Sequence, residues 1–397
     1  MNDEIAKLGN CSLSGDEIVE ILLRLPVKAL LRFQTVSKSW HSFITSRDFI
    51  QLHRQQPVHE KLLRISDRGR RDIPTISFFT LAPRLADFEI DRIVDVDLAE
   101  LESLSVVVDA VDLPFPCSAD DEVRVVGSCN GILCVHFNRS SSIVLWNPAT
   151  RKYRFLELPD YVSFYSDPFF PYVMFGYVPE KDDYNVVKVS SCRRKDERDT
   201  KVWVYTMSSD TWEEMDGDFL CGLVPKGGSA VSVNGCLYWM SCSDDDGLNV
   251  ITCFDLCKRV FGRVKLPNHD IVTKFTMVKL MVLKDCLSMI IDYGNGVDVD
   301  HYEVWVMNER QGEAESWTKQ FDFLPFSTLA QPVGSWRDVE LLFANPGGLS
   351  PELVSYNAFT EEIYCFRRRS LMGDVVKRAT SLKQGIFTEA TISCSKA

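Results

Sequence analysis

The sequence predicts a multidomain α+β protein: a small N-terminal unit of three helices, then a larger all-β domain with the repeats of a β-propeller. Three observations lead to this prediction. Apolar residues follow helical spacing between residues 17 and 50, short alternating apolar runs begin after about residue 72, and one hairpin pattern recurs along the β region. A length of 397 residues also suits two units better than one compact core.

The predicted helices begin close to the N-terminus. Two groups of apolar residues have the spacing of a helix face: Ile18, Ile21, Leu22 and Leu25, then Val36, Trp40, Phe43 and Ile44. Ser14 is placed to cap the first helix, and Glu17 stands at the matching capping-box position. Pro26 either ends that helix or begins the next, because proline fits only the first turn of a helix.

This helical unit has more large apolar side chains than its own core can hide. Between residues 17 and 25, six of nine residues are apolar, and fourteen large apolar side chains occur in the 28 residues from 17 to 44. They cover more than the ~100° stripe that a surface helix turns toward its core. We therefore expect another chain to cover the unit, although packing on the chain's own β-domain is the alternative.

The β region repeats one hairpin. An apolar strand residue, a polar turn and a bulky residue seven positions later recur as Trp146 and Tyr153, Tyr205 and Trp212, Phe254 and Phe261, and Tyr356 and Ile363, with a longer turn between Trp305 and Trp317. The first members are 59, 49, 51 and 51 residues apart, near the ~50-residue period of kelch-type propeller blades. We interpret Trp146, Trp212 and Trp317 as core residues.

A second hairpin precedes most copies, at 128–136, 232–240 and 283–291, which gives each unit enough strands for a four-stranded blade. Five units lie between about 123 and 370, and the stretch from Ile76 to Leu98 is a candidate for a sixth unit or for closing the ring. An open or a closed propeller fits this pattern. Two packed antiparallel sheets remain the alternative, because hairpin periodicity does not distinguish them.

Composition and motifs argue against several functional classes. The net charge of −12 gives no reason to approach nucleic acid, and no apolar run approaches the ~18 residues of a membrane span. The sequence has none of the common hydrolase, phosphate-loop, dinucleotide or zinc-protease motifs, so we predict no catalytic residue and no cofactor. No cysteine pair has C-x-x-C spacing, and the acidic loops at 244–247 and 298–300 lack the ligand spacing of a calcium loop, so no metal site is predicted.

The chain begins MNDEIAKLGN, which has neither a cationic nor an apolar signal region, and its thirteen cysteines are an odd number. These features favour reduced, mostly buried thiols. We therefore expect a cytoplasmic or nuclear protein.

Residues 13 to 50 closely resemble the F-box, the module by which substrate receptors dock on the Skp-family adaptor of cullin-RING ubiquitin ligases. The matching positions are Leu13, Glu17, Ile21, Leu22, Leu25, Pro26, Leu30, Arg32, Phe33, Val36, Ser37 and Trp40. The resemblance implies adaptor contacts from Leu13, Ile21, Leu22, Leu25, Pro26, Leu30, Leu31, Val36 and Trp40. Ser14 occupies a position where the family usually has proline, which removes one expected adaptor contact.

Downstream motifs, among them GSCNGILCV, LWNPATRKY and NGCLYWMSC, resemble the F-box-associated domain of plant F-box proteins in the expected order. The expected organisation is a flexible start (1–12), an F-box (13–55), a connecting segment with strands and a possible first blade (56–122), the β-repeat domain (123–370) and a C-terminal strand or tail (371–397). The resemblance implies a non-catalytic substrate receptor of an SCF-type ubiquitin ligase. The F-box binds the adaptor, and through it cullin and RING subunits, while the β-domain binds an unidentified protein target for ubiquitination and turnover.

The target surface is predicted from one aromatic-rich insertion. The stretch 160–172 lengthens one repeat step, and its Tyr165, Phe169 and Phe170 are candidate target contacts because interface anchors are often aromatic. Packing between blades is the alternative for these residues. For the whole chain, the alternative function is a propeller scaffold or carbohydrate-binding module that does not promote ubiquitination.

Overall fold

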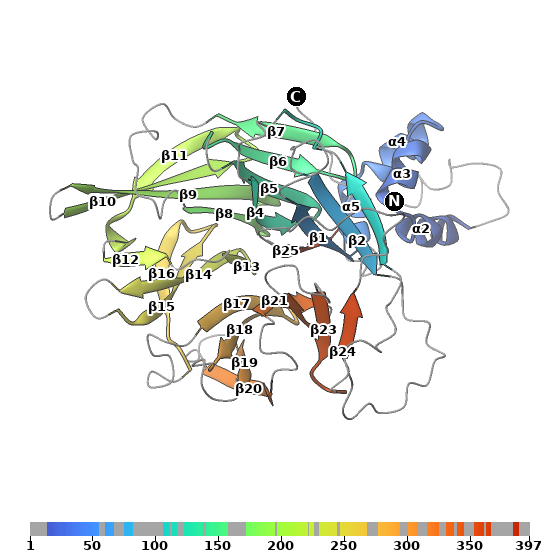
Figure 1. The fold of residues 1–397 in the computed structure, drawn as a ribbon. Helices are drawn as coiled ribbons and strands as arrows, with labels where there is room; N and C mark the ends of the chain where they lie inside the picture. The colour runs from blue at the N-terminus through green and yellow to red at the C-terminus, as the bar shows by residue number, and fades with distance from the viewer. Residues whose placement is uncertain are drawn as a thin grey trace.

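The structure is a computed structural model. It describes residues 14–54, 60–66, 75–81, 106–111, 113–116, 123–137, 140–157, 172–194, 197–220, 222–225, 230–243, 247–267, 277–293, 301–308, 316–324, 331–336, 340–344, 353–360, 363–366 and 384–388. Figure 1 shows the helices as one group at the margin of the β-sheets. The larger part of the described chain is therefore β-structure.

The described part of the N-terminal unit contains four short helices. They are α2 (Gly15–Leu23), α3 (Val27–Phe33), α4 (Lys38–Ile44) and α5 (Arg47–Arg54). The Ser14 capping box is confirmed, and Pro26 occupies the N-cap of α3, so it begins the second helix. The sequence predicted three helices up to residue 50. The fourth arises because α4 ends at Thr45 and Ser46 Oγ accepts a hydrogen bond from Phe49 N, 3.3 Å, in the first turn of α5.

The described strands form six antiparallel sheets, which we call blades 1 to 6. Blade 1 contains β1 (Glu60–Ser66), β2 (Thr75–Leu81), β3 (Val106–Val111) and β25 (Gln384–Thr388). Blade 2 contains β4 (Val123–Cys129), β5 (Ile132–Phe137), β6 (Ile143–Asn147) and β7 (Lys152–Leu156). Blade 3 contains β8 (Tyr172–Val178), β9 (Asp183–Arg194), β10 (Glu197–Thr206) and β11 (Thr211–Asp216), followed by a 3-10 turn, η3 (Asp218–Leu220).

The other three blades follow the same plan. Blade 4 contains β12 (Leu223–Pro225), β13 (Val231–Val233), β14 (Cys236–Ser243), β15 (Asn249–Asp255) and β16 (Val260–Val264). Blade 5 contains β17 (Met277–Leu283), β18 (Cys286–Asp292), β19 (Tyr302–Asn308) and β20 (Ser316–Phe323). Blade 6 contains β21 (Gln331–Trp336), β22 (Glu340–Ala344), β23 (Leu353–Asn357) and β24 (Ile363–Phe366).

The six blades form a closed ring. One strand of each blade contacts the next blade in the order β25, β4, β8, β14, β17, β21 and back to β25. Blade 1 closes the ring because β25 pairs with β1 in the register Leu62 to Ile386. The C-terminal segment thus completes a sheet begun by the predicted connecting segment. The alternative of two packed sheets is wrong, because a ring of six sheets gives each blade two neighbours.

The repeated residues occupy equivalent strands. Trp146, Tyr205, Phe254 and Tyr356 lie on the third strand of their blades, directly opposite the partners that the sequence predicted. The fifth copy differs, because a register shift next to Trp305 places it opposite Lys319 and places Trp317 opposite Met307. The prediction of core tryptophans is confirmed for Trp146, which is fully buried. Trp212 and Trp317 are only partly buried and pack against neighbouring clusters.

Candidate functional site

The helical unit has a small core of its own. Leu22, Leu30, Phe43, Ile44 and Phe49 are each at most 3% exposed and pack together. The fourth helix closes this core, because buried His53 donates a hydrogen bond from Nε2 to the carbonyl oxygen of Leu25, 2.9 Å. The four helices therefore form one packed unit.

Other apolar side chains of this unit remain outside its core. Ile21, Val36 and Leu52 are 49%, 63% and 37% exposed. Ile21 lies in the last turn of α2, and half-buried Leu25 follows the C-cap of that helix. We call the set of exposed and half-buried residues Ile21, Leu25, Pro26, Leu31, Val36, Trp40 and Leu52 the outer apolar set; of these, Leu25 and Trp40 also pack against the core.

The predicted adaptor-contact residues separate into two groups. Leu22 and Leu30 are 1% and 0% exposed, so in this structure they support the helices from inside and offer no surface to a partner. Ile21, Leu25, Pro26, Leu31, Val36 and Trp40 belong to the outer apolar set. Leu13 lies outside the described residues, and so do the candidate target contacts Tyr165, Phe169 and Phe170.

Sequence reasoning missed Leu52, because the predicted helices ended at residue 50. The available signal was the pattern of α5, in which buried Phe49 and His53 are four residues apart and Leu52 lies between them. A helix that buries residues 49 and 53 on one side must turn some neighbours outward. Of the apolar neighbours Ile50 and Leu52, Leu52 is the exposed one, so it extends the outer apolar set to the fourth helix.

The start of α2 is fixed by reciprocal hydrogen bonds. Ser14 N donates to Glu17 Oε2, 2.7 Å, and Glu17 N donates to Ser14 Oγ, 3.3 Å. The bond from the backbone of Ser14, and then the bond that involves its side chain, hold the pKa of Glu17 below its usual value. The serine at this position therefore has a structural role as the N-cap.

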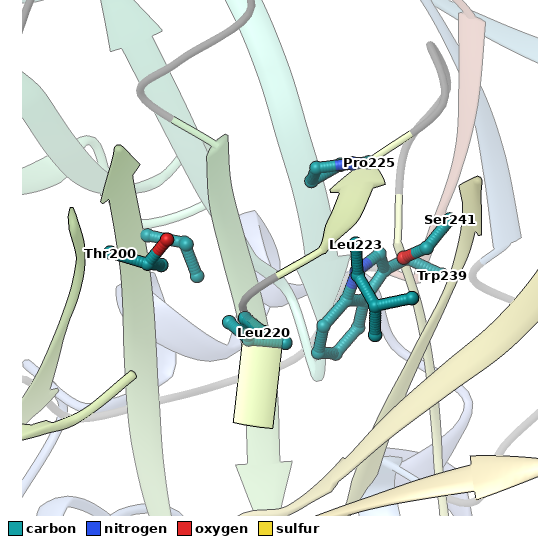
Figure 2. A pocket seen from close by; sticks show the side chains of 7 residues that line it. Thr200, Leu220, Leu223, Pro225, Trp239 and Ser241 are labelled. Atoms are coloured by element: carbon teal, nitrogen blue, oxygen red, sulfur yellow. The ribbon is translucent and has the colours of Figure 1, made fainter. Parts of the chain in front are cut away.

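A cavity of about 240 Å³, counting its open mouth, lies between blades 3 and 4 (Figure 2). Its walls are mainly apolar and include Leu220 and Trp239, with hydroxyl groups from Thr200 and Ser241. Buried Thr200 Oγ1 has no hydrogen-bond partner among the described residues. Among the described residues, the side chains that line this cavity include no titratable group.

His301, Glu303 and Asp322 bring three possible metal-ligand atoms within 4.8 Å of one another in blade 5. The ammonium group of Lys319 already lies 3.0 Å from both Glu303 Oε1 and Asp322 Oδ2. Glu303 is also the acceptor for Tyr293 and Trp305, 2.9 Å each. Because the lysine compensates both carboxylates, the residues fit an internal ion-pair network better than a metal site.

Comparison with known proteins identifies two domains. Residues 11–52 match the family model of the F-box domain, and residues 84–343 match that of the F-box associated beta propeller domain. None of the helices in the described ranges is long and apolar enough to cross a membrane.

Two relatives from Arabidopsis thaliana span most of the chain. An F-box/kelch-repeat protein is 29% identical over 79% of this chain and 80% of its own length, and an F-box protein is 27% identical over 83% of this chain and 78% of its own. A solved structure of TolB from Acinetobacter baumannii aligns with a TM-score of 0.46 and 10% identity over 88% of this chain and 73% of that one. Since the propeller model alone spans more than half of the residues, the chain belongs to the family of F-box proteins with an F-box associated beta propeller domain.

Proposed function

We propose that this protein is the substrate receptor of an SCF-type ubiquitin ligase. The helical unit binds a Skp-family adaptor through the outer apolar set, and the propeller binds a protein target. The observation that carries this proposal is the exposure of Ile21 and Val36 on a unit whose core is already filled by other side chains. The F-box family match supports the same assignment.

Burial of the outer apolar set would contribute to the free energy of a complex. Full burial of a large aliphatic side chain contributes ~1.5 to 3 kcal/mol. Ile21, Val36 and Leu52 start partly exposed, so an adaptor gains only part of that from each. No single contact of this size offsets the entropy cost of association, so several of them must form in the same complex. Single polar substitutions in the set are therefore expected to weaken binding strongly.

The proposal assigns no bond-breaking step to this chain. A receptor accelerates ubiquitin transfer by holding the target close to a charged conjugating enzyme, which raises the effective concentration of the reacting groups. Such a role requires two binding surfaces and a fixed relation between them. The adaptor-binding surface is assigned to the helices, and the target surface to the propeller.

The test is co-purification of the full chain with a Skp-family adaptor. We expect a stoichiometric complex with the wild type and loss of the complex with Val36→Asp and with Ile21→Glu. The matched control is Val260→Asp, because Val260 is 58% exposed on β16 of the propeller, close to the 63% of Val36. The control should bind the adaptor as the wild type does.

Two results would contradict the proposal. Retention of the complex by both helical variants would show that the outer apolar set is not the binding surface. Absence of any complex with folded wild-type protein would favour a propeller scaffold or carbohydrate-binding module outside a ligase. Circular dichroism spectra of each variant and of the wild type are compared, so that loss of binding can be distinguished from loss of folding.

A further inference from the structure

One carboxylate of the propeller contacts two residues of the helical unit. Asp182 lies in the turn between β8 and β9. It accepts a hydrogen bond from Arg54 Nη1 of α5, 3.3 Å, and forms an ion pair with Arg47 of the same helix, whose Nε lies 3.0 Å from Oδ2. Tyr177 of β8 donates its hydroxyl to the same carboxylate, 2.6 Å. One side chain of blade 3 thus binds both ends of the helix that precedes the propeller.

The two arginines differ in their surroundings. Arg47 and Arg54 are the first and last residues of α5, two helical turns apart, so they project from the same side of the helix. The Arg54 side chain is only 13% exposed, and its guanidinium lies 5.9 Å from the centre of the Tyr177 ring. Arg47 is 69% exposed. Arg54 therefore makes the shielded contact, and shielded charge-assisted bonds are stronger than surface ion pairs.

The electrostatics keep this arrangement charged. Burial acts to raise the pKa of Asp182, but the hydrogen bond from Tyr177 and the charges of the two arginines outweigh it, so the pKa lies below the usual value. Burial and the bond to Asp182 raise the pKa of Tyr177. At neutral pH the carboxylate is therefore ionised and the phenol keeps the proton that it donates.

The backbone at Asp182 limits which residues fit there. Its φ is 48°, in the left-handed region that aspartate, asparagine and glycine tolerate best. Asparagine can therefore replace this aspartate and keep the turn while removing the charge. Asp285 offers a matched site: it has a φ of 58° in the turn between the first two strands of blade 5, and its side chain is exposed.

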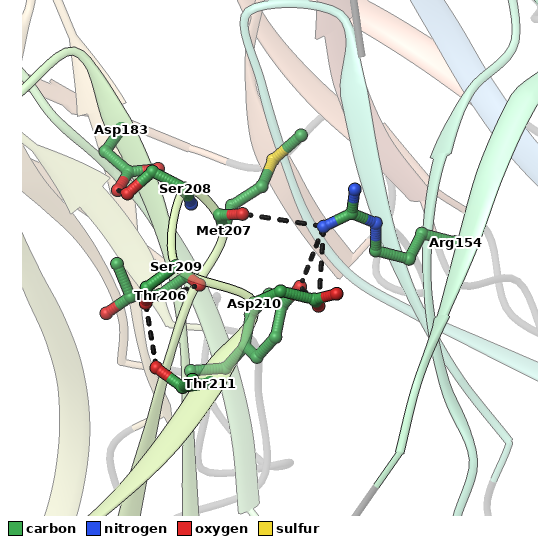
Figure 3. Close-up of polar contacts among 9 residues, drawn as sticks. Arg154, Asp183, Thr206, Met207, Ser208, Ser209, Asp210 and Thr211 are labelled. Carbon is green, nitrogen blue, oxygen red and sulfur yellow. Dashed lines mark hydrogen bonds and ion pairs between the residues drawn. The ribbon is translucent and has the colours of Figure 1, made fainter. Parts of the chain in front are cut away.

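The turn that carries Asp182 is itself held in place. The next residue, Asp183, accepts hydrogen bonds from Ser208 N, 3.1 Å, and from the Ser208 hydroxyl in the β10–β11 turn of the same blade (Figure 3). Arg154 of blade 2 reaches that second turn, where it contacts Met207 O at 3.5 Å and Asp210 Oδ1 at 3.4 Å. These bonds join blade 3 to blade 2 beside the helical unit.

Arg259 of blade 4 contacts the two strands, β10 and β11, that the second turn connects. Arg259 donates from Nη2 to Thr206 Oγ1, 2.9 Å, and its Nη1 lies 3.4 Å from Glu213 Oε2 of β11. Three neighbouring blades are thus joined by side-chain bonds next to Asp182. A helix anchored to this carboxylate is therefore anchored to a rigid part of the ring rather than to a free loop.

We propose that Asp182 is a positioning residue that locks the helical unit in one orientation on the propeller. It does so by binding both Arg47 and Arg54. Because the Arg54 and Asp182 side chains are 13% and 20% exposed, salt screens this pair less than it screens the pair with Arg47, which is 69% exposed. The consequence for ubiquitin transfer, a target held at a fixed place relative to the adaptor, rests on the proposed function. The lock itself does not, because all of its parts belong to this chain.

The first test measures the orientation in the free chain. Spin labels are placed as genetically encoded residues at exposed Lys38 of α4 and exposed Lys152 of β7, which leaves the native cysteines untouched. We expect a single narrow distance peak for the wild type and loss of that peak in Asp182→Asn. Arg54→Gln should have the same effect, and the double variant should be no broader than either single variant, because both changes remove one interaction.

The control is Asp285→Asn, which makes the same chemical change in a comparable turn and should keep the narrow peak. An unchanged narrow peak in Asp182→Asn, with folding verified by thermal denaturation, would overturn the proposal. So would equal broadening in the control, which would show a general loosening of the propeller.

The second test uses a ligase reconstituted with adaptor, cullin, RING subunit and conjugating enzyme, and maps ubiquitin on the chain's own lysines. We expect Asp182→Asn to retain the adaptor but to change which lysines are modified. Wild-type selectivity in this variant would overturn the positioning role. If the wild type binds no adaptor, the proposed function is wrong. The distance measurement in the free chain still tests whether Asp182 fixes the orientation of the helical unit.

Discussion

The two units of this protein differ in where they place their large apolar side chains. In the propeller the largest ones are enclosed: Trp146, Trp203 and Trp239 are each at most 1% exposed. In the helical unit Val36 is 63% exposed and Ile21 49%. The propeller thus encloses its largest side chains between blades, although single apolar residues such as Leu324 and Phe359 are exposed on it, whereas the helical unit leaves Ile21 and Val36 outside a core that is already filled.

The difference follows from geometry. Each blade of a closed ring buries both of its faces against neighbours, and pairing of β25 with β1 leaves no end blade uncovered. Four short helices can enclose only one side of each helix, and here that side is filled by Leu22, Leu30 and their neighbours. Apolar residues on the remaining sides stay in contact with water until another protein covers them.

The largest expected effect breaks the complete unit. Trp146→Ala removes a fully buried indole that packs with Phe115 and Val144 in blade 2. We expect the free energy of unfolding to fall by ~3 to 5 kcal/mol, as for other buried aromatic residues. Urea denaturation monitored by fluorescence measures this change. A loss below ~1 kcal/mol would show that the site is not a packed core.

A second comparison concerns adjacent residues of α2. Leu22→Ala empties part of the helical core and should cost ~2 to 5 kcal/mol of unfolding free energy, whereas Ile21→Ala removes a half-exposed side chain and should cost under ~1 kcal/mol. Adaptor binding should weaken in Ile21→Ala although the protein remains folded. Hydrogen exchange of the helical amides reports stability, and co-purification reports binding. Equal destabilisation by both changes would contradict the division between core and outer apolar set.

Much of this comparison could be predicted from the sequence, because local patterns decide it. The helical spacing, the cap at Ser14 and the residues Trp146 and Tyr153, which face each other across a strand pair, all depend on neighbours within a few positions. The separation of Leu22 from Ile21 could not be predicted, since both match the family motif and only packing distinguishes them. A closed ring was one of two options that the sequence left open, and the pairing of β25 with β1 that closes it could not be predicted because it joins strands at opposite ends of the chain.

The joint at Asp182 shows a second limit. Arg54 and Asp182 are 128 residues apart in the sequence. Charged residues in a helix end and in a hairpin turn are common on surfaces, so the sequence offers no reason to pair them. The pairing depends on how two domains are oriented, which is a property of the complete fold.

A buried lysine makes the propeller less stable than its packing allows. Lys188 is 1% exposed on β9, between Val173 and Trp203 in the sheet, and burial lowers its pKa to about 8. In Lys188→Met the charge is replaced by an apolar side chain of similar length. At pH 7 we expect a gain on the order of 3 kcal/mol in unfolding free energy, from ~1.36 kcal/mol per pKa unit.

The pH dependence gives the sign of this effect. The folded-state pKa of Lys188 lies below its unfolded value of 10.5, so the unfolded chain binds more protons between about pH 8 and pH 10.5 and the wild type gains stability as the pH rises through that window. The methionine variant lacks this gain. Its advantage should therefore be full below pH 8 and should shrink toward pH 10.5. Urea titrations of both proteins at pH 7 and pH 10 measure it, and a constant difference would contradict the assignment.

The smallest expected effect returns to the first residue of the helical unit, where the family usually has proline. Ser14 has a φ of −66°, which is the value that a proline ring imposes, so Ser14→Pro fits the backbone. The change removes both capping-box bonds with Glu17 and should cost ~0.5 to 2 kcal/mol of helix stability. It also restores the residue type expected at the adaptor contact, so we expect tighter adaptor binding from a less stable helix. Calorimetric titration with the adaptor and hydrogen exchange of α2 measure the two effects separately. Ser14→Ala is the control, because it loses the side-chain cap without introducing proline and should lower stability without improving affinity.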